Sequence, residues 1–135
     1  MSTSIIIGIV IAAIVAFITH FLFKGRVLWV WRIGLIIAAL IYVGFAISGD
    51  APLEKDLLGV VIYSSFALLS IRYGLIWLAI GWALHIGWDV IVHLESSHVP
   101  TWYPALCFGF DVAIALYIIF LIRKTHEVNS PVTTS

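Results

Sequence analysis

The sequence predicts an all-α integral membrane protein, a bundle of five transmembrane helices. Hydrophobic residues make up 63% of the 135-residue chain and charged residues only 10%, whereas a soluble domain is about a quarter charged. Five apolar runs approach or reach the roughly 18–20 residues that cross a bilayer. We therefore expect one membrane domain over residues 1–124, followed by a polar, disordered tail over 125–135.

The first two spans are expected to form an antiparallel pair. The first lies over about residues 5–23 and the second over about 27–48. Only the short stretch 24–26 separates them, so the chain must return directly beside its first span. Trp29 and Trp31 near the start of the second span are typical of the headgroup level of a bilayer.

Three further spans complete the bundle. A polar connection over residues 49–56 leads to the third span, expected over about 57–73. A tight turn separates it from the fourth span, over about 75–94. The longest internal loop, residues 95–104, precedes the fifth span over about 105–122, and two basic residues follow that span.

Basic and acidic residues gather on opposite sides of this arrangement. One side holds Lys24, Arg26, Arg72, Arg123 and Lys124, and the other holds Asp50, Glu54, Asp56 and Glu95. Basic residues beside membrane spans mark the cytoplasmic side. We therefore expect the N-terminus outside and the C-terminus inside the cell (cytoplasmic) membrane. Membrane lipid is the expected partner, and a net charge of zero gives no indication of nucleic acid.

Three ionisable side chains interrupt the fourth span. His85, Asp89 and His93 recur at every fourth residue, so a helix places them on one stripe. Ionisable groups inside membrane spans are rare and mark functional sites. In the outward-running fourth span this stripe descends from the outer surface toward the membrane centre. Cys107 and Asp111 descend the fifth span at interleaved depths, also four residues apart.

Two aspartates at this depth need a compensating group, because burial and a like-charged neighbour both oppose ionisation. A divalent metal ion, an imidazolium or retained protons would each serve. Histidine and aspartate suit zinc, copper, iron and manganese. On an ideal helix His85 and His93 lie about 12 Å apart along the axis, too far for one ion. The preferred ligands are His85, Asp89 and Asp111, with His93 a ligand or a general base.

Two variants of the metal site stay open. In the first, Asp89 and His93 bind an ion together with Cys107 or His98. In the second, two adjacent ions share the aspartates. A single cysteine is more typical of a small buried hydrophobic residue, and His98 falls in a loop.

These polar residues form a recognisable pattern with their neighbours, which comprises His85, Trp88, Asp89, His93, the loop Pro100–Pro104, Cys107 and Asp111. From Leu84 to Ala115 the chain thereby resembles an uncharacterised family of small bacterial multi-pass membrane proteins. The family pattern is His-x-x-Trp-Asp-x-x-His-His, a loop with proline and tryptophan, then Cys-x-x-x-Asp. Val92 stands where that pattern has the first histidine of its pair. The resemblance implies that the polar set forms one unit, and it implies no activity.

The leading hypothesis is a metal-binding membrane protein whose site opens outward. It includes a metal-dependent enzyme that acts on an apolar or lipid-like substrate, although the sequence does not decide whether the protein is an enzyme. One alternative is a component of a proton- or cation-coupled carrier. Residues 112–116 offer that carrier no polar path inward, unless a homo-oligomer supplies one. The other alternative is a structural or assembly subunit, in which the stripe bonds helices together.

Overall fold

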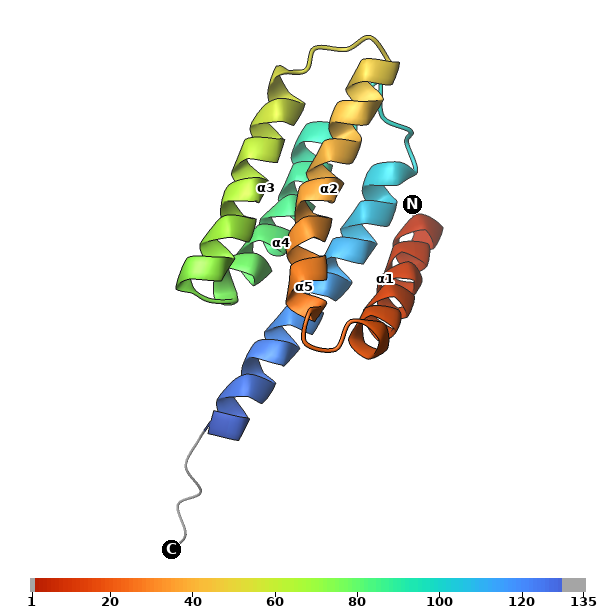
Figure 1. The fold of residues 1–135 in the computed structure, drawn as a ribbon. Helices are drawn as coiled ribbons and strands as arrows, with labels where there is room; N and C mark the ends of the chain where they lie inside the picture. The colour runs from red at the N-terminus through yellow and green to blue at the C-terminus, as the bar shows by residue number, and fades with distance from the viewer. Residues whose placement is uncertain (1, 130–135) are drawn as a thin grey trace, which may run out of the picture.

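The computed structural model describes residues 2–129, which form a bundle of helices (Figure 1). Five of its helical units are long and apolar enough to cross a membrane. The prediction of an all-α, multi-pass membrane protein with five spans is confirmed. The elements are α1 (Ser2–Leu22), α2 (Val27–Ser48), α3 (Glu54–Tyr73), α4 (Ile76–Trp88), the π-helical turn η1 (Asp89–His93) and α5 (Tyr103–Asn129).

Several helix boundaries differ from expectation, and the first span already begins at Ser2 rather than near residue 5. The third span begins at Glu54 rather than at residue 57, with Glu54 and Asp56 in its first turn, where carboxylates are favoured by the helix dipole. The fifth span continues to Asn129 instead of ending near residue 122. The tail expected over 125–135 is therefore helical at its start, and residues 130–135 lie outside the described part of the chain.

The fourth span changes its winding where the ionisable stripe lies. The α-helix ends at Trp88, and the next five residues form the wider π-helical turn η1. Turns of this kind are rare and occur frequently at functional sites. His85, Asp89 and His93 nevertheless all face the interior, at 0%, 0% and 2% exposure. The stripe is thus buried as its spacing predicts, but on a backbone that is not wholly α-helical.

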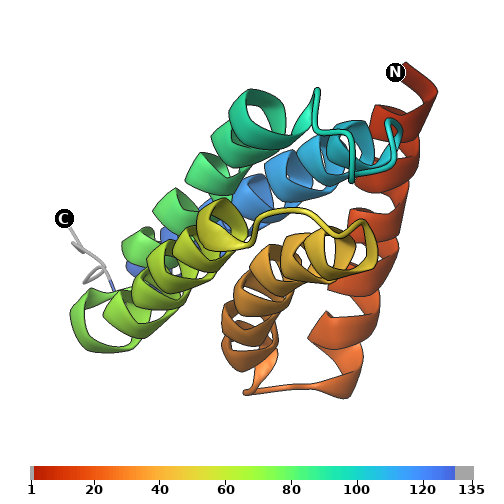
Figure 2. The same ribbon diagram turned by 90° about the horizontal axis from the view of Figure 1, so that it is seen from above.

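Helix α5 lies between α1 and α4, while α3 lies between α4 and α2 (Figure 2). Within the described residues, α2 packs chiefly on α3, and its backbone does not approach α5. Aromatic side chains bridge part of the gap between α2 and α5, with Trp31 in edge contact with both Trp82 and Tyr117. This arrangement leaves a broad interior that side chains, rather than close backbones, must fill.

One half of that interior is closed by apolar side chains. The Trp82 Nε1–H donates to the backbone oxygen of Trp31 at 3.3 Å, and the two indole rings meet at 6.3 Å. Leu35, Ile114 and Ile118 surround them with no exposed surface. This closed layer lies between the ionisable stripe and the end of the bundle formed by the α1–α2 and α3–α4 turns (Figure 1).

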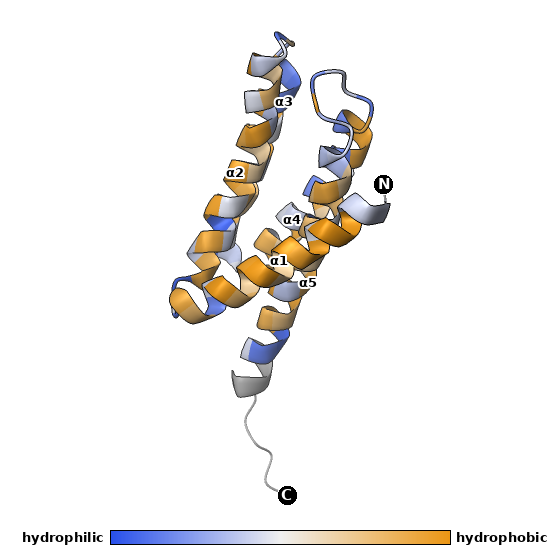
Figure 3. Cartoon of the chain, turned by 90° about the vertical axis from the view of Figure 1, so that its right-hand side faces the viewer, coloured by the Kyte–Doolittle hydropathy of each residue, from blue (hydrophilic) through white to orange (hydrophobic). Residues whose placement is uncertain are grey.

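Helix α1 crosses α5 through two glycines. A Cβ atom on Gly8 would collide with the backbone oxygen of Leu106, and one on Gly109 would collide with that of Ile5. Small residues of this kind let membrane helices approach closely. The rest of α1 presents an almost continuous apolar surface away from the bundle (Figure 3). The two glycines therefore position the helix that has the fewest buried residues of its own.

We expect Gly8→Leu to lower the free energy of unfolding in detergent by about 3 kcal/mol or more, since rigid backbone atoms cannot make room for the new side chain. Gly44→Leu is the matched control, because Gly44 is exposed within a helix and has no neighbour within 4 Å of an added Cβ. Thermal unfolding followed by tryptophan fluorescence measures both. Equal losses in the two variants would show that the α1–α5 crossing is not held by this contact.

Candidate metal centre

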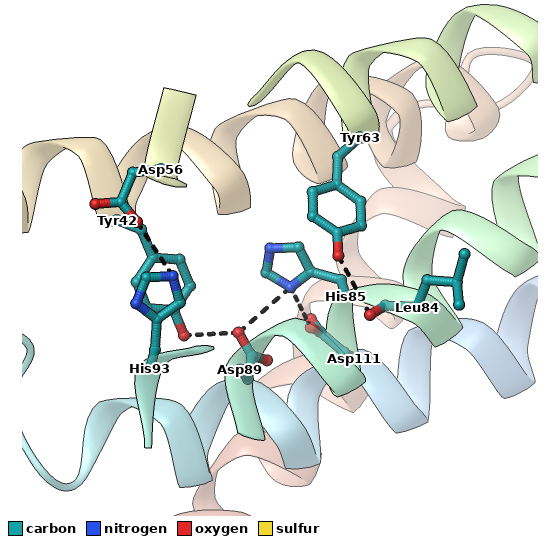
Figure 4. Close-up of polar contacts among 8 residues, drawn as sticks. All are labelled: Tyr42, Asp56, Tyr63, Leu84, His85, Asp89, His93 and Asp111. Atoms are coloured by element: carbon teal, nitrogen blue, oxygen red, sulfur yellow. Dashed lines mark hydrogen bonds and ion pairs between the residues drawn. The ribbon is translucent and has the colours of Figure 1, made fainter. Parts of the chain in front are cut away.

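Three of the residues singled out in the sequence meet at the centre of the bundle. His85 comes from α4, Asp89 from η1 and Asp111 from α5, and none is more than 1% exposed. His85 Nδ1 lies 2.7 Å from Asp111 Oδ2 and 3.5 Å from Asp89 Oδ1 (Figure 4). We refer to these three residues as the deep triad. Each offers one ligand atom, and the three atoms lie within 4.8 Å of one another.

This spacing fits a single metal ion. Zinc bonds to nitrogen and oxygen are about 2.0–2.2 Å long, so two ligand atoms of a tetrahedral site lie about 3.4 Å apart. The 3.5 Å distance between His85 Nδ1 and Asp89 Oδ1 is already close to this ligand–ligand distance. The 2.7 Å contact of His85 with Asp111 would open by less than about 1 Å as its proton is replaced by an ion.

The deep triad has hydrogen-bonding capacity that its own members do not use. His85 Nε2 and Asp89 Oδ2 are buried and make no hydrogen bond within the described residues. An imidazolium would donate from both ring nitrogens, yet only Nδ1 of His85 faces acceptors. Buried polar atoms are usually satisfied, and Asp89 Oδ2 is therefore an oxygen that remains free to bind a ligand.

Two tyrosines support the deep triad from neighbouring helices. The Tyr42 hydroxyl of α2 donates to Asp89 Oδ1 at 2.6 Å. Tyr63 of α3 lies edge-on to the ring of His85 at 4.6 Å and donates to the Leu84 backbone oxygen at 3.2 Å. Contacts of this type orient metal ligands. Sequence reasoning missed both roles, although Tyr42 shares its helix face with the buried Leu35, Ala39 and Ala46.

His93 belongs to a different group. Its Nε2 lies 3.2 Å from Asp56 Oδ1, and His98 Nε2 lies 3.7 Å from Asp56 Oδ2 (Figure 4 shows the first of these contacts). We refer to Asp56, His93 and His98 as the second triad, whose ligand atoms also lie within 4.8 Å of one another. The structure thus brings His93 and His98 together around Asp56, whereas Asp89 lies in the deep triad.

Asp56 is the site residue that sequence reasoning overlooked. The sequence placed it in a polar connection, but it stands in the first turn of α3 and is only 2% exposed. A signal was present in the spacing. Asp56 is in register with the buried residues Gly59, Tyr63, Ala67 and Ser70 of the same helix. A helix that begins three residues earlier therefore points this carboxylate inward.

Cys107 stands in neither triad. Its side chain is buried on α5 and lines an apolar cavity of about 310 Å³ together with Asp111 and Tyr103. The other walls are mostly apolar side chains of α1 and α2 and the ring of Trp82. This cavity connects the aspartate of the deep triad with apolar surroundings.

The fold and the deep triad define a multi-pass membrane protein with a buried His/Asp centre. Residues 3–124 match a family of unknown function, DUF6010, and the chain belongs to that family. Membership of an uncharacterised family, which the residue pattern predicted, is therefore confirmed. Comparison with the curated proteins and with the solved structures gives no match.

Tyr42→Phe is expected to lower the free energy of unfolding by about 1–3 kcal/mol, because it leaves the buried carboxylate of Asp89 without its donor. Tyr73→Phe is the control, since Tyr73 is 66% exposed at the end of α3. Unfolding in detergent, followed by far-UV circular dichroism, compares the two. A Tyr42→Phe protein as stable as the control would mean that this hydrogen bond contributes nothing to the folded state.

Proposed function

We propose that the protein binds a divalent or transition metal ion in the deep triad. The observation that supports this is the convergence of three buried ligand atoms from α4, η1 and α5 within 4.8 Å. Two carboxylates inside a membrane protein are costly unless their charge is compensated. No lysine or arginine among the described residues pairs with Asp89 or Asp111. An ion of charge +2 would supply that compensation.

The ligand chemistry narrows the metal to ions that accept nitrogen and oxygen donors. One imidazole and two carboxylates suit zinc, iron, manganese and Cu(II). Cu(I) prefers thiolate and thioether ligands, and Cys107 is not part of the triad. A bound ion of the proposed kind would lower the pKa of a bound water, so that this water could attack an ester.

The apolar cavity supports an enzymatic form of the proposal, with an apolar or lipid-like substrate. Its volume of about 310 Å³ is bordered by Asp111, so a hydrocarbon group inside it would lie beside the deep triad. Ile11 of α1 and Ile37 of α2 are among the side chains that would contact it. His93 has no direct part in this scheme, because its Nε2 faces Asp56 rather than the deep triad.

Binding is favoured over transport by the closed layer beneath the deep triad. A carrier would need polar groups or water to continue toward the opposite end of the bundle. Trp31, Leu35, Trp82, Ile114 and Ile118 occupy that region and are at most 2% exposed. The buried histidines and aspartates of the described part instead continue from the deep triad toward the α2–α3 turn, through His93 and Asp56. At the opposite end the buried Ser70 pairs with Arg32 on the far side of the apolar layer.

The metal proposal is tested by the metal content of the purified protein. We expect about one equivalent in the deep triad when purification avoids chelators, and its loss in His85→Ala/Asp89→Asn, measured by elemental mass spectrometry. The control is His20→Ala/Asp50→Asn, which changes the same residue types at exposed positions.

Folding of each variant is checked by circular dichroism and gel filtration. A folded double variant that retains as much metal as the control would contradict the proposal. So would a native protein that binds no zinc, copper, iron or manganese on addition. Flux of protons or cations into liposomes without tightly bound metal would favour the carrier. A structural role would be favoured if the native protein holds no metal and the double variant fails to fold.

We further propose that the α2–α3 turn faces the outside of the cell membrane, with the N-terminus outside and the C-terminus inside. Support comes from the basic residues at the opposite end, including Lys24 and Arg72. In a Cys107→Ser background, Asp50→Cys should react with a membrane-impermeant maleimide on intact cells. Lys24→Cys should react only after the cells are permeabilised. The reverse pattern would invert the proposed orientation.

A further inference from the structure

We propose that the second triad, Asp56, His93 and His98, is a metal site in its own right, for a zinc-like divalent ion. It lies at the α2–α3 end of the bundle and draws its ligands from α3, η1 and the loop that precedes α5. It shares no ligand with the deep triad. The inference therefore stands whether or not the deep triad binds a metal.

The first support is a set of close contacts that are not hydrogen bonds. His93 Nε2 and Asp56 Oδ1 are 3.2 Å apart, and His98 Nε2 and Asp56 Oδ2 are 3.7 Å apart. Yet Asp56 Oδ1 and both Nε2 atoms are buried and make no hydrogen bond within the described residues. Side chains that converge at these distances without hydrogen-bond geometry between them are placed to share a cation.

The second support is the burial of the charge. Asp56 and His93 are each 2% exposed, although they lie near the end of the bundle. Lys55 follows Glu54 at the rim, but no ion pair joins it to Asp56 among the described residues. A carboxylate so placed is costly unless a cation compensates it.

The third support is access. A cavity of about 160 Å³ is lined by all three members of the second triad and by Lys55, Glu54 and Ser96. The His98 side chain is 16% exposed, so an aqueous ion can reach the triad from this end. Two imidazoles and one carboxylate with adjoining free volume match zinc sites that have three protein ligands and a water.

The two triads are in contact through Tyr42. Its ring stacks on that of His93 at 3.7 Å with an interplanar angle of 9°, and its hydroxyl donates to Asp89 of the deep triad. The turn η1 supplies Asp89 to one triad and His93 to the other. An ion that fixes His93 therefore also restrains a residue that orients the deep triad.

The test is the zinc stoichiometry of the full-length protein in detergent. Protein is incubated with Zn²⁺ and desalted, and bound zinc is measured by elemental mass spectrometry. We expect His98→Ala and Asp56→Asn each to hold one equivalent fewer than the native protein, and His20→Ala, an exposed histidine outside both triads, to match the native protein. Co²⁺ substitution gives a second readout, because the visible absorption that the second triad contributes should be lost from the spectrum of His98→Ala and kept in that of His20→Ala.

The outcomes separate the two sites. If Asp89→Asn binds one equivalent fewer and His98→Ala also does, both triads hold zinc. If only His98→Ala and Asp56→Asn lose an equivalent, the second triad stands and the deep triad does not hold zinc. If both of these variants bind as much zinc as the native protein, or if the native protein binds none, the second triad is not a metal site. His98→Ala decides the question should Asp56→Asn not fold, since His98 lies in a partly exposed loop.

Discussion

The contact between His85 and Asp111 is the constraint on which the polar interior depends. It joins α4 to α5 at 2.7 Å in the centre of an otherwise apolar bundle. Asp89 lies one turn further along the same span as His85, and the Tyr42 hydroxyl of α2 donates a hydrogen bond to the Asp89 carboxylate. Three of the five spans thereby contribute to one polar network, because isolated charges are costly in a membrane interior.

Much of this arrangement was predictable from the sequence, for identifiable reasons. Hydropathy indicated five spans. Because the fourth and fifth spans run in opposite directions side by side, the sequence also predicted that His85, Asp89 and Asp111 lie at similar depths. Asp56 was overlooked because the third span was expected to begin after it, although its spacing to the buried residues of α3 already pointed it inward. Tyr42 was missed because its contact depends on how α2 lies across the bundle. The π-helical turn has no sequence signature that periodicity detects.

Helix α1 has a different role from the other spans. It supplies no residue to either triad, and it is held against α5 by the close approach at Gly8 and Gly109. Its Ile11 and Val15 instead form part of the wall of the apolar cavity that Asp111 borders. The second to fifth spans thus supply the buried ionisable groups, and α1 completes the wall of the apolar cavity beside them.

The closed layer of Trp31 and Trp82 has a consequence for the sidedness of any chemistry at the deep triad. An ion that replaces protons on its ligands would release those protons, and among the described residues the buried polar groups next to the deep triad, His93 and Asp56, lead toward the α2–α3 end. Reactants and products would then exchange with one compartment alone. Metal occupancy of the deep triad would follow the metal concentration and the pH of that compartment. Binding and release would not dissipate the ion gradients across the membrane.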